Sequence, residues 1–309
     1  MLYRKNIMFL TVACFAVAAC STASKLPNSR NLPSNEPSLS LNGYVLEPNA
    51  DLSNADLSQG DLSRLNLEGT DLSGADLSNA RMSQTNLSYT NLRNANLSGA
   101  DLEEANLTGA DLEGAILTGS NFTSINLNGA NLSGADLTSV FTSGGTFVGA
   151  NLSFSKIYGK QLVSVDMSNV DLTGSNIAGT NLCGSNLQGS NLTDAYLYGT
   201  FLPASNLSNA NFSNADLSEA QLMGSNMSRA NFSRANLKKA NLASPKSSDD
   251  YCGIFGISAT SLEGSNMTDS NLVEADLRGV NLKGAILSGA NLYGAKLNGA
   301  TMPDGSIGK

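Results

Sequence analysis

A five-residue repeat runs through most of the chain and constrains its fold more than any other feature. The unit is Ala-Asp/Asn-Leu-Ser-x; we call the leucine position i. Position i−2 is nearly always small and position i−1 is usually Asn or Asp. The register is the same at both ends of the repeat, as these leucines show: Leu52, Leu57, Leu62, Leu67, Leu282, Leu287, Leu292 and Leu297. This continuity favours one repetitive unit over two ordinary globular domains.

A period of five is incompatible with the two common regular structures. On an α-helix, successive leucines would be rotated by about 140° and would spread around the axis. On a flat strand they would alternate between the two faces. A chain that turns a corner every five residues instead directs every i and i−2 side chain inward. Four such units close one coil, and stacked coils pair their backbones at the ~4.8 Å spacing of neighbouring strands.

The repeat resembles that of the pentapeptide-repeat family, A(D/N)Lxx, over about residues 49–302. The resemblance implies an all-β protein, namely a right-handed quadrilateral parallel β-helix. We assign this fold to residues 42–309 and expect about 13 coils, counting degenerate repeats, in a solenoid whose coils contact only their neighbours. Residues 42–48 and 303–309 are the expected caps, because open coil ends invite edge-to-edge association.

The polar residues at position i−1 are predicted to point outward. Asn and Asp side chains hydrogen-bond nearby backbone groups in turns. Because residues 20 apart stack on one face of a four-unit coil, the sequence also predicts a ladder of side chains that stabilises the stack. The clearest such column is Asn131, Asn151, Asp171, Asn191, Asn211 and Asn231.

Two stretches, 139–165 and 244–261, depart from the repeat. In the first, Thr142 occupies position i and Lys160 occupies position i−2. An unpaired buried lysine is costly, so we expect either a local bulge of the backbone or a Lys160 side chain that reaches out to solvent. The second stretch is either a degenerate coil or an excursion that rejoins in register. Both are consistent with neutral drift or with a binding loop on a rigid scaffold.

A candidate interaction surface is assigned to aromatic and acidic residues in or near these breaks. Exposed apolar side chains that lie close together can mark contact sites. The candidates are Phe141, Phe154, Tyr158, Tyr196, Tyr198, Phe201, Asp249, Asp250 and Tyr251.

The N-terminus carries the features of an export signal. Arg4 and Lys5 precede an uncharged run over residues 7–19, which has the length of a signal-peptide core and is short for a membrane span. The run ends in Val-Ala-Ala before Cys20, which resembles a bacterial lipobox and implies a signal peptide over 1–19 and lipidation of Cys20. An ordinary signal-peptidase site at residues 16–18 is the competing interpretation.

The segment after Cys20 is predicted to be a flexible tether. Residues 20–41 are rich in Ser, Pro and Asn and hold few large apolar side chains, so they cannot bury enough surface to fold alone. By resemblance to lipoproteins of Gram-negative cells, Ser21 after the cysteine favours the outer membrane over the inner. The expected location is therefore the cell envelope, with the membrane as one partner through the lipid.

The remaining cysteines are predicted to be free thiols. Cys14 would leave with the signal peptide. In an uninterrupted solenoid, Cys183 and Cys252 lie on different faces and more than three coils apart, which exceeds the reach of a disulfide. The exception would be a segment 244–261 that folds far back.

Composition argues against catalysis. The chain has no His and no Trp, so Ser-His, Cys-His and His-metal chemistry are unavailable. The net charge is −8, which disfavours nucleic-acid binding. Residues 42–140 hold 13 acidic and three basic side chains, a net charge of −10, so the rest of the chain is close to neutral. We expect no enzyme activity, cofactor, metal or small-molecule substrate.

The expected function is that of a rigid envelope scaffold or protein-interaction surface with an unknown protein partner. The family resemblance leaves two alternatives open. One is a DNA mimic that binds a topoisomerase, which the acidic first third of the repeat favours and the export signal opposes. The other is a secreted effector that acts on a host.

Overall fold

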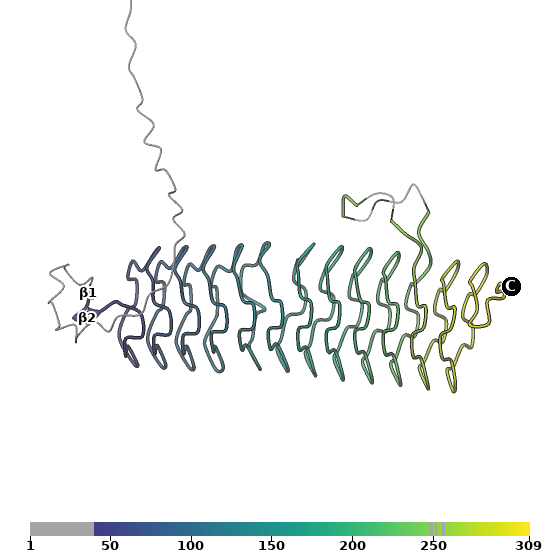
Figure 1. Ribbon diagram of the computed structural model, residues 1–309, viewed down its shortest axis with the longest axis horizontal. Coiled ribbons are helices and arrows are strands. Elements are labelled where there is room, and N and C mark those ends of the chain that lie inside the picture. The colour runs from purple at the N-terminus through teal and green to yellow at the C-terminus, as the bar shows by residue number, and fades with distance from the viewer. Residues whose placement is uncertain (1–39, 247–249, 251, 255–256) are drawn as a thin grey trace, which may run out of the picture. The chain divides into compact units, whose positions relative to one another are not determined.

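Residues 38–309 form one compact unit of stacked coils (Figure 1). The computed structural model describes residues 40–246, 250, 252–254 and 257–309. The expected signal peptide, Cys20, nearly all of the tether, Asp249 and Tyr251 lie outside the described residues. Within those that are described, no helix has the length and apolar character needed to cross a membrane.

A short antiparallel hairpin begins the unit. Strand β1 (Ser40–Leu41) pairs with β2 (Tyr44–Val45) across an Asn42-Gly43 turn. Both turn residues have positive φ, 52° and 87°, as a two-residue hairpin turn of this type requires. Leu41 and Tyr44 pack against the core of the first coils. The hairpin therefore provides the N-terminal cap expected at 42–48 and begins two residues earlier.

The coils are held together by parallel backbone bridges between residues 20 apart. Asp51 bridges Asp71, and Asp71 in turn bridges Asn91; the same step repeats on all four sides. Each bridge is a single residue, because the chain turns again after five. The expected four-sided β-helix is thus present, with each coil bonded only to its neighbours.

A tight turn forms each corner. The carbonyl of Leu52 accepts a hydrogen bond from the Ala55 amide at 3.1 Å, which closes a four-residue turn. Its third residue, Asn54, has φ of +56°. Position i+2 has positive φ at nearly every corner of the solenoid, which explains why it is so often Gly or Asn. The repeat is therefore a repeated turn as much as a repeated strand.

The interior consists of stacked large and small side chains. Leucines at position i, such as Leu87 and Leu187, are fully buried, and so are alanines at i−2, such as Ala80. Phenylalanine replaces leucine at Phe212 and Phe232, whose rings stack at 4.8 Å between centroids. Close packing of this kind leaves little space for voids.

Buried Ser and Thr replace Ala at many i−2 positions without leaving polar atoms unpaired. The Ser205 hydroxyl donates to the Leu182 carbonyl at 2.8 Å, and the Ser155 hydroxyl donates to the Leu152 carbonyl at 2.6 Å. Ser265 and Ser270 are the exceptions among the described residues. A buried hydroxyl needs such a partner to avoid a desolvation penalty.

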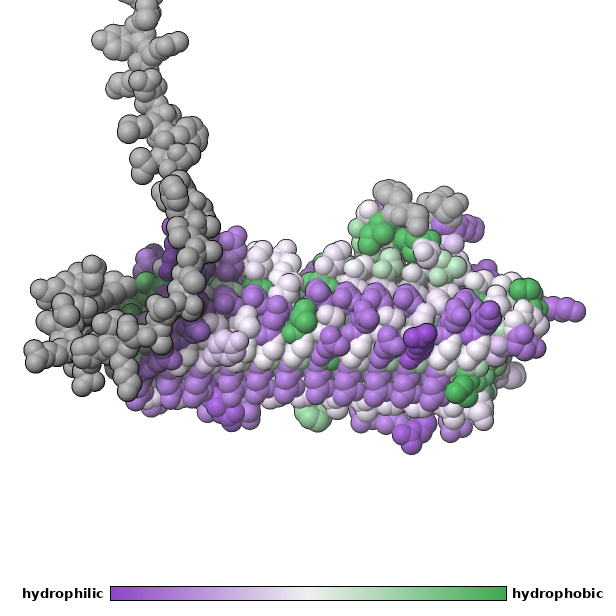
Figure 2. All heavy atoms as spheres, in the orientation of Figure 1, coloured by the Kyte–Doolittle hydropathy of each residue, from purple (hydrophilic) through white to green (hydrophobic). Residues whose placement is uncertain are grey.

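The predicted side-chain ladder is confirmed. Asn151 donates to Asn131 at 3.1 Å, and Asn231 donates to Asn211 at 2.9 Å, one coil apart. In these bonds the donor lies in the later coil. A carboxylate has no hydrogen to donate, so an aspartate in the ladder only accepts, as Asp171 does from Asn191. The side-chain oxygens also accept backbone amides two residues on, for example Ser153 onto Asn151. Figure 2 shows such polar rows along the rod.

The C-terminal residues fold back on the last coil. Thr301 bridges Ile307 in the antiparallel sense, and the Gly308 amide donates to the Ala300 carbonyl at 2.8 Å. Residues 303–309 thus lie where the second cap was expected. They cover the end only in part, because Leu287, Leu292 and Leu297 remain half-buried.

Candidate interaction surfaces

The second irregular stretch is an excursion from the solenoid. Asn226 bridges Ser261 and Asn241 bridges Asp276, so the separation rises from 20 to 35 residues at this coil and returns to 20 afterwards. The extra length is 15 residues, and we call residues 245–259 the side loop. Because those residues contribute no repeat, the solenoid has about 12 coils and not the expected 13.

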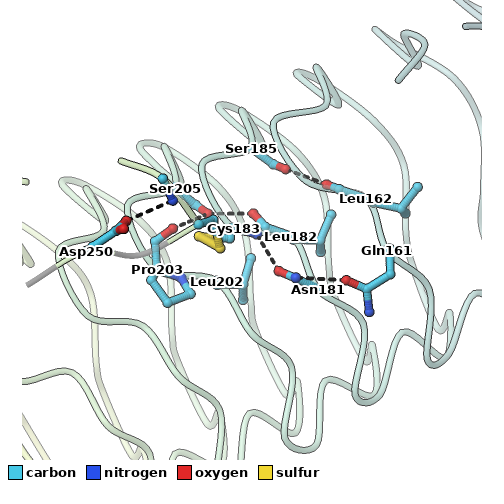
Figure 3. The surroundings of a disulfide bond; sticks show 12 residues. Gln161, Leu162, Asn181, Leu182, Cys183, Ser185, Leu202, Pro203, Ser205 and Asp250 are labelled. Atoms are coloured by element: carbon cyan, nitrogen blue, oxygen red, sulfur yellow. Dashed lines mark hydrogen bonds between the residues drawn. A yellow bond between two sulfur atoms is a disulfide. The ribbon is translucent and has the colours of Figure 1, made fainter. Parts of the chain in front are cut away.

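The side loop is closed by a disulfide between Cys183 and Cys252, with a Cα–Cα distance of 6.4 Å. The prediction of two free thiols is therefore wrong. It assumed that residue 252 continued the coil; instead, the loop runs back toward the N-terminus along the rod, over the coils before its origin (Figure 1). Figure 3 shows Cys183 among residues of successive coils, beside Leu162, Leu182 and Leu202.

The surface beneath the loop is unusually apolar for this solenoid. On the side of the rod that carries Cys183, position i+1 is Ser or another polar residue in the first coils, as at Ser63 and Ser83. Over five consecutive coils it becomes apolar: Val163, Cys183, Pro203, Met223 and Ala243. Cys183, Pro203 and Met223 are buried. Burial of this strip stabilises the back-folded position of the loop.

The loop contacts this side through two isoleucines. Ile254 lies over Gly184, and Ile257 lies over Gly224, where an added Cβ would be 2.5 and 2.2 Å from the respective isoleucine methyl groups. Glycine is thus the residue that fits beneath each of them. The Gly253 amide also donates to the Asp250 carboxylate at 2.8 Å, which orders the turn next to Cys252.

Ser244 and Thr260 fix the base of the loop. The Thr260 amide donates to the Ser244 hydroxyl at 3.1 Å, and that hydroxyl donates to the Gly279 carbonyl at 2.6 Å. The Thr260 hydroxyl donates to the Ala243 carbonyl at 3.3 Å and accepts the Gly224 amide at 2.7 Å. These bonds replace the backbone pairing that the excursion interrupts, so the coils continue in register.

The first irregular stretch is a local opening of the backbone ladder. Elsewhere the residue at i−1 donates its amide to the previous coil, as Asn181 does to the Lys160 carbonyl. At the corresponding position one coil earlier, the Val140 carbonyl instead accepts a hydrogen bond from the Lys160 ammonium at 2.6 Å. Partial burial lowers the Lys160 pKa, and the Asp136 carboxylate opposes that shift. The first alternative, a local departure of the backbone, is therefore the one observed. Lys160 does not reach out to solvent: it is half-buried, and its ammonium bonds the backbone at the opening of the ladder.

The aromatic candidates fall on three sides of the rod. Tyr158, Tyr196 and Tyr198 share one side, since Lys156 bridges Asn176 and Asn176 bridges Tyr196. Phe141 and Phe201 lie at i−1 positions of the adjacent side, which is also the side that carries the loop. Phe154 lies on a third side, where its ring covers Gly174. Asp250 is exposed in the side loop. The seven candidates that the structure describes therefore do not form one continuous surface.

Tyr196 and Tyr198 form the one exposed aromatic pair among the described residues. Their ring centroids are 6.3 Å apart and their planes differ by 14°. The Tyr198 hydroxyl donates to the Glu219 carboxylate of the next coil at 2.8 Å, and this bond raises the Tyr198 pKa. The orientation of the Tyr198 ring is thus fixed from both sides.

The acidic first third of the rod is partly neutralised by its three arginines. Arg93 forms ion pairs with Glu113 at 2.6 Å and with Asp111 at 3.0 Å, and Arg81 pairs with Asp61 at 2.9 Å. Exposed ion pairs such as these contribute little to stability.

No group of three or more His, Cys, Asp or Glu side chains in the described part of the chain could hold a metal ion.

Family membership follows from comparison with known proteins. The pentapeptide-repeat family model matches residues 50–88, 85–123, 115–153, 166–202, 205–242 and 265–302. The chain belongs to the pentapeptide-repeat family. The expected right-handed quadrilateral β-helix is thereby confirmed, and the gap in the matches between 242 and 265 coincides with the side loop. Members of this family are generally non-enzymatic proteins with structural or interaction roles.

Solved structures of the family cover most of the chain. HetL, a pentapeptide repeat protein involved in heterocyst differentiation regulation in Nostoc sp. PCC 7120, is 30% identical over 85% of this chain and 94% of its own, with a TM-score of 0.47. QnrB1, a plasmid-mediated fluoroquinolone resistance protein, is 18% identical over 77% of this chain and 93% of its own, with a TM-score of 0.23.

A pentapeptide repeat protein of the Arabidopsis thaliana thylakoid lumen is 29% identical over 39% of this chain and 66% of its own, with a TM-score of 0.23. No curated protein sequence matches the chain significantly.

Proposed function

We propose that this pentapeptide-repeat protein is exported to the cell envelope, anchored by lipid at Cys20, and acts there as a rigid, non-enzymatic scaffold or interaction surface. The rod supplies regular sides on which contact residues keep fixed spacings. The side loop and the exposed aromatic residues add the irregular features that a partner can recognise on a repetitive surface.

The observation that carries the export proposal is the disulfide between Cys183 and Cys252. Disulfides persist in oxidising compartments such as the periplasm and are rare in the cytosol. This support is independent of the N-terminal residues, because the bond lies within the solenoid and its side loop. It agrees with the signal-like run at residues 7–19 and the lipobox-like sequence before Cys20.

The anchoring proposal is tested by fractionation of cells that express Cys20→Ala or, as the matched control, Cys14→Ala. We expect the wild type and Cys14→Ala in the membrane fraction, because residue 14 would be removed with the signal. Cys20→Ala should leave that fraction or accumulate unprocessed. A Cys20→Ala protein that stays processed and membrane-bound would defeat the proposal.

A second candidate function rests on the 13 acidic side chains of residues 42–140. A rod with an acidic surface could imitate DNA and occupy a topoisomerase. The test is a gyrase supercoiling assay with the purified protein at micromolar concentration. Inhibition would support this candidate, whereas unaffected supercoiling would dismiss it and leave the envelope proposal intact.

A further inference from the structure

One side of the rod carries two tyrosines that are aligned along its length. Tyr158, Ala178 and Tyr198 occupy the same i+1 position in three successive coils, because the Gly159 amide donates to the Ala178 carbonyl and the Gly179 amide donates to the Tyr198 carbonyl. Tyr158 and Tyr198 are therefore two coils apart, about 9–10 Å along the rod at the inter-strand spacing. Their side chains are 48% and 43% exposed.

The corner beside these tyrosines is open. Gly159, Gly179 and Gly199 follow them in the turns, and an added Cβ at any of the three would find no atom within 4 Å. Some other corners are filled, for example by Tyr89 over Gly109 and by Phe154 over Gly174, whereas others, such as that at Gly129, are open too. A ligand that lies along the rod at this corner would thus lie beside the tyrosines and meet no side chain over Gly159, Gly179 or Gly199.

The charged groups around the tyrosines are mostly acidic. Lys156 forms an ion pair with Asp136 at 3.4 Å, and Glu219 accepts the Tyr198 hydroxyl at 2.8 Å. The Asp216 carboxylate, on the residue that bridges Tyr196, adds further negative charge beside the rings, so this surface disfavours an anionic ligand and is compatible with a neutral one. Asn176, half-exposed between the tyrosine positions, adds an amide that can bond hydroxyl groups.

The exposed aromatic area is small for a protein partner. Aromatic side chains bury about 150–250 Å² each when fully covered. Three tyrosines that are roughly half-exposed thus offer on the order of 300 Å², whereas a stable protein interface buries about 800 Å² per partner. A narrow line of ring faces with hydroxyl-bonding neighbours is better suited to a flat, extended chain.

We propose that Tyr158, Tyr196 and Tyr198 form a binding platform for an extended, neutral β-1,4-linked polysaccharide that lies along the rod axis. The apolar faces of pyranose rings would stack on the tyrosines. The two-coil separation of Tyr158 and Tyr198 corresponds to the disaccharide repeat of such a chain, so alternate sugars would meet a ring. The platform belongs to the folded rod and requires no lipid anchor.

The experiment is a titration of the purified wild-type rod with cellohexaose and with chitohexaose, followed by tyrosine fluorescence. The chain has no Trp, so the signal comes from tyrosines. We expect saturable binding of at least one hexaose and weaker binding of the disaccharide built from the same sugar, which cannot reach both Tyr158 and Tyr198. No saturable binding of either hexaose, or equal affinity for hexaose and disaccharide, would overturn the proposal.

Variants assign the site. Tyr158→Ala and Tyr198→Ala should each weaken hexaose binding about five- to tenfold, the effect of losing one stacked ring. Ala178→Gln should also weaken it by placing a longer side chain between the rings, at a position type that tolerates Gln188 on another side. Tyr89→Ala, at a residue 65% exposed on a different side, is the control. Equal binding by Tyr158→Ala, Tyr198→Ala and Tyr89→Ala would overturn the assignment.

Discussion

At the residue scale, each position of the repeat has one physical task. Leucine at i fills the interior, Asn or Asp at i−1 bonds the next coil, and i+2 adopts the left-handed backbone region. The first two tasks could be predicted from residue type and period. The third was missed, although a signal was present: position i+2 is Gly or Asn in many repeats, as at Gly69, Gly74 and Asn79.

Two glycine substitutions separate backbone strain from steric conflict. Gly129 and Gly145 both have positive φ, but an added Cβ at Gly129 meets nothing within 4 Å, whereas at Gly145 it lies 2.7 Å from the Ile125 carbonyl oxygen. We expect Gly129→Ala to lower the free energy of unfolding by about 1 kcal/mol. Gly145→Ala should cost at least about 1 kcal/mol more. Urea denaturation measures both, and equal losses would contradict the turn geometry.

The aspartates at i−1 predict an acid-sensitive fold. Hydrogen bonds from Ser78 lower the Asp76 pKa, and bonds from Thr138 lower that of Asp136. A carboxyl group whose pKa is lower in the folded state than in the unfolded chain stabilises the fold at pH values above its unfolded-state pKa. This contribution is lost as the pH falls through its folded-state pKa. The melting temperature should therefore hold between pH 7 and 5 and fall below about pH 4.

Asp76→Asn is the matched variant for the pH series, since it keeps the side-chain oxygen that Ser78 and Asn96 donate to. Its melting temperature should fall less steeply in acid than that of the wild type. Identical pH profiles in thermal scans would show that Asp76 does not contribute.

At the element scale, the side loop is what the sequence could not resolve. Residue spacing allowed either a degenerate coil or an excursion, because both preserve a period of five. Prediction of the disulfide depended on which of the two was correct, because the bond forms only when the loop turns back along the rod. The run of apolar i+1 residues from Val163 to Ala243 was the available signal. It marks a surface that something covers, on a solenoid whose other i+1 positions are mostly polar.

Loss of the disulfide should free the loop and leave the rod folded. In Cys252→Ser we expect trypsin to cleave after Lys246 several-fold faster than in the oxidised wild type, because local opening governs access. Thermal scans should still show a folded solenoid. Lys246→Gln, which removes the cleavage site, is the control for peptide assignment. Equal cleavage rates with and without Cys252 would mean that the disulfide does not hold the loop.

At the scale of the whole molecule, about 12 coils form one solenoid whose properties change along its length. The acidic residues concentrate in the first coils, and the ladder opening, tyrosine platform and side loop all lie beyond residue 135. The overall architecture could be predicted from the period together with the resemblance of the repeat to that of the pentapeptide-repeat family. The distribution of aromatic candidates over three sides could not, because it depends on which positions share a column.

The envelope account makes one prediction about the entire chain, and the intact mass of the native protein from the membrane fraction tests it most directly. The account predicts a chain that begins at Cys20, carries added lipid mass there, and gains about two mass units on reduction as the bond between Cys183 and Cys252 opens. An unlipidated chain that retains residues 1–19 and does not change mass on reduction would contradict it.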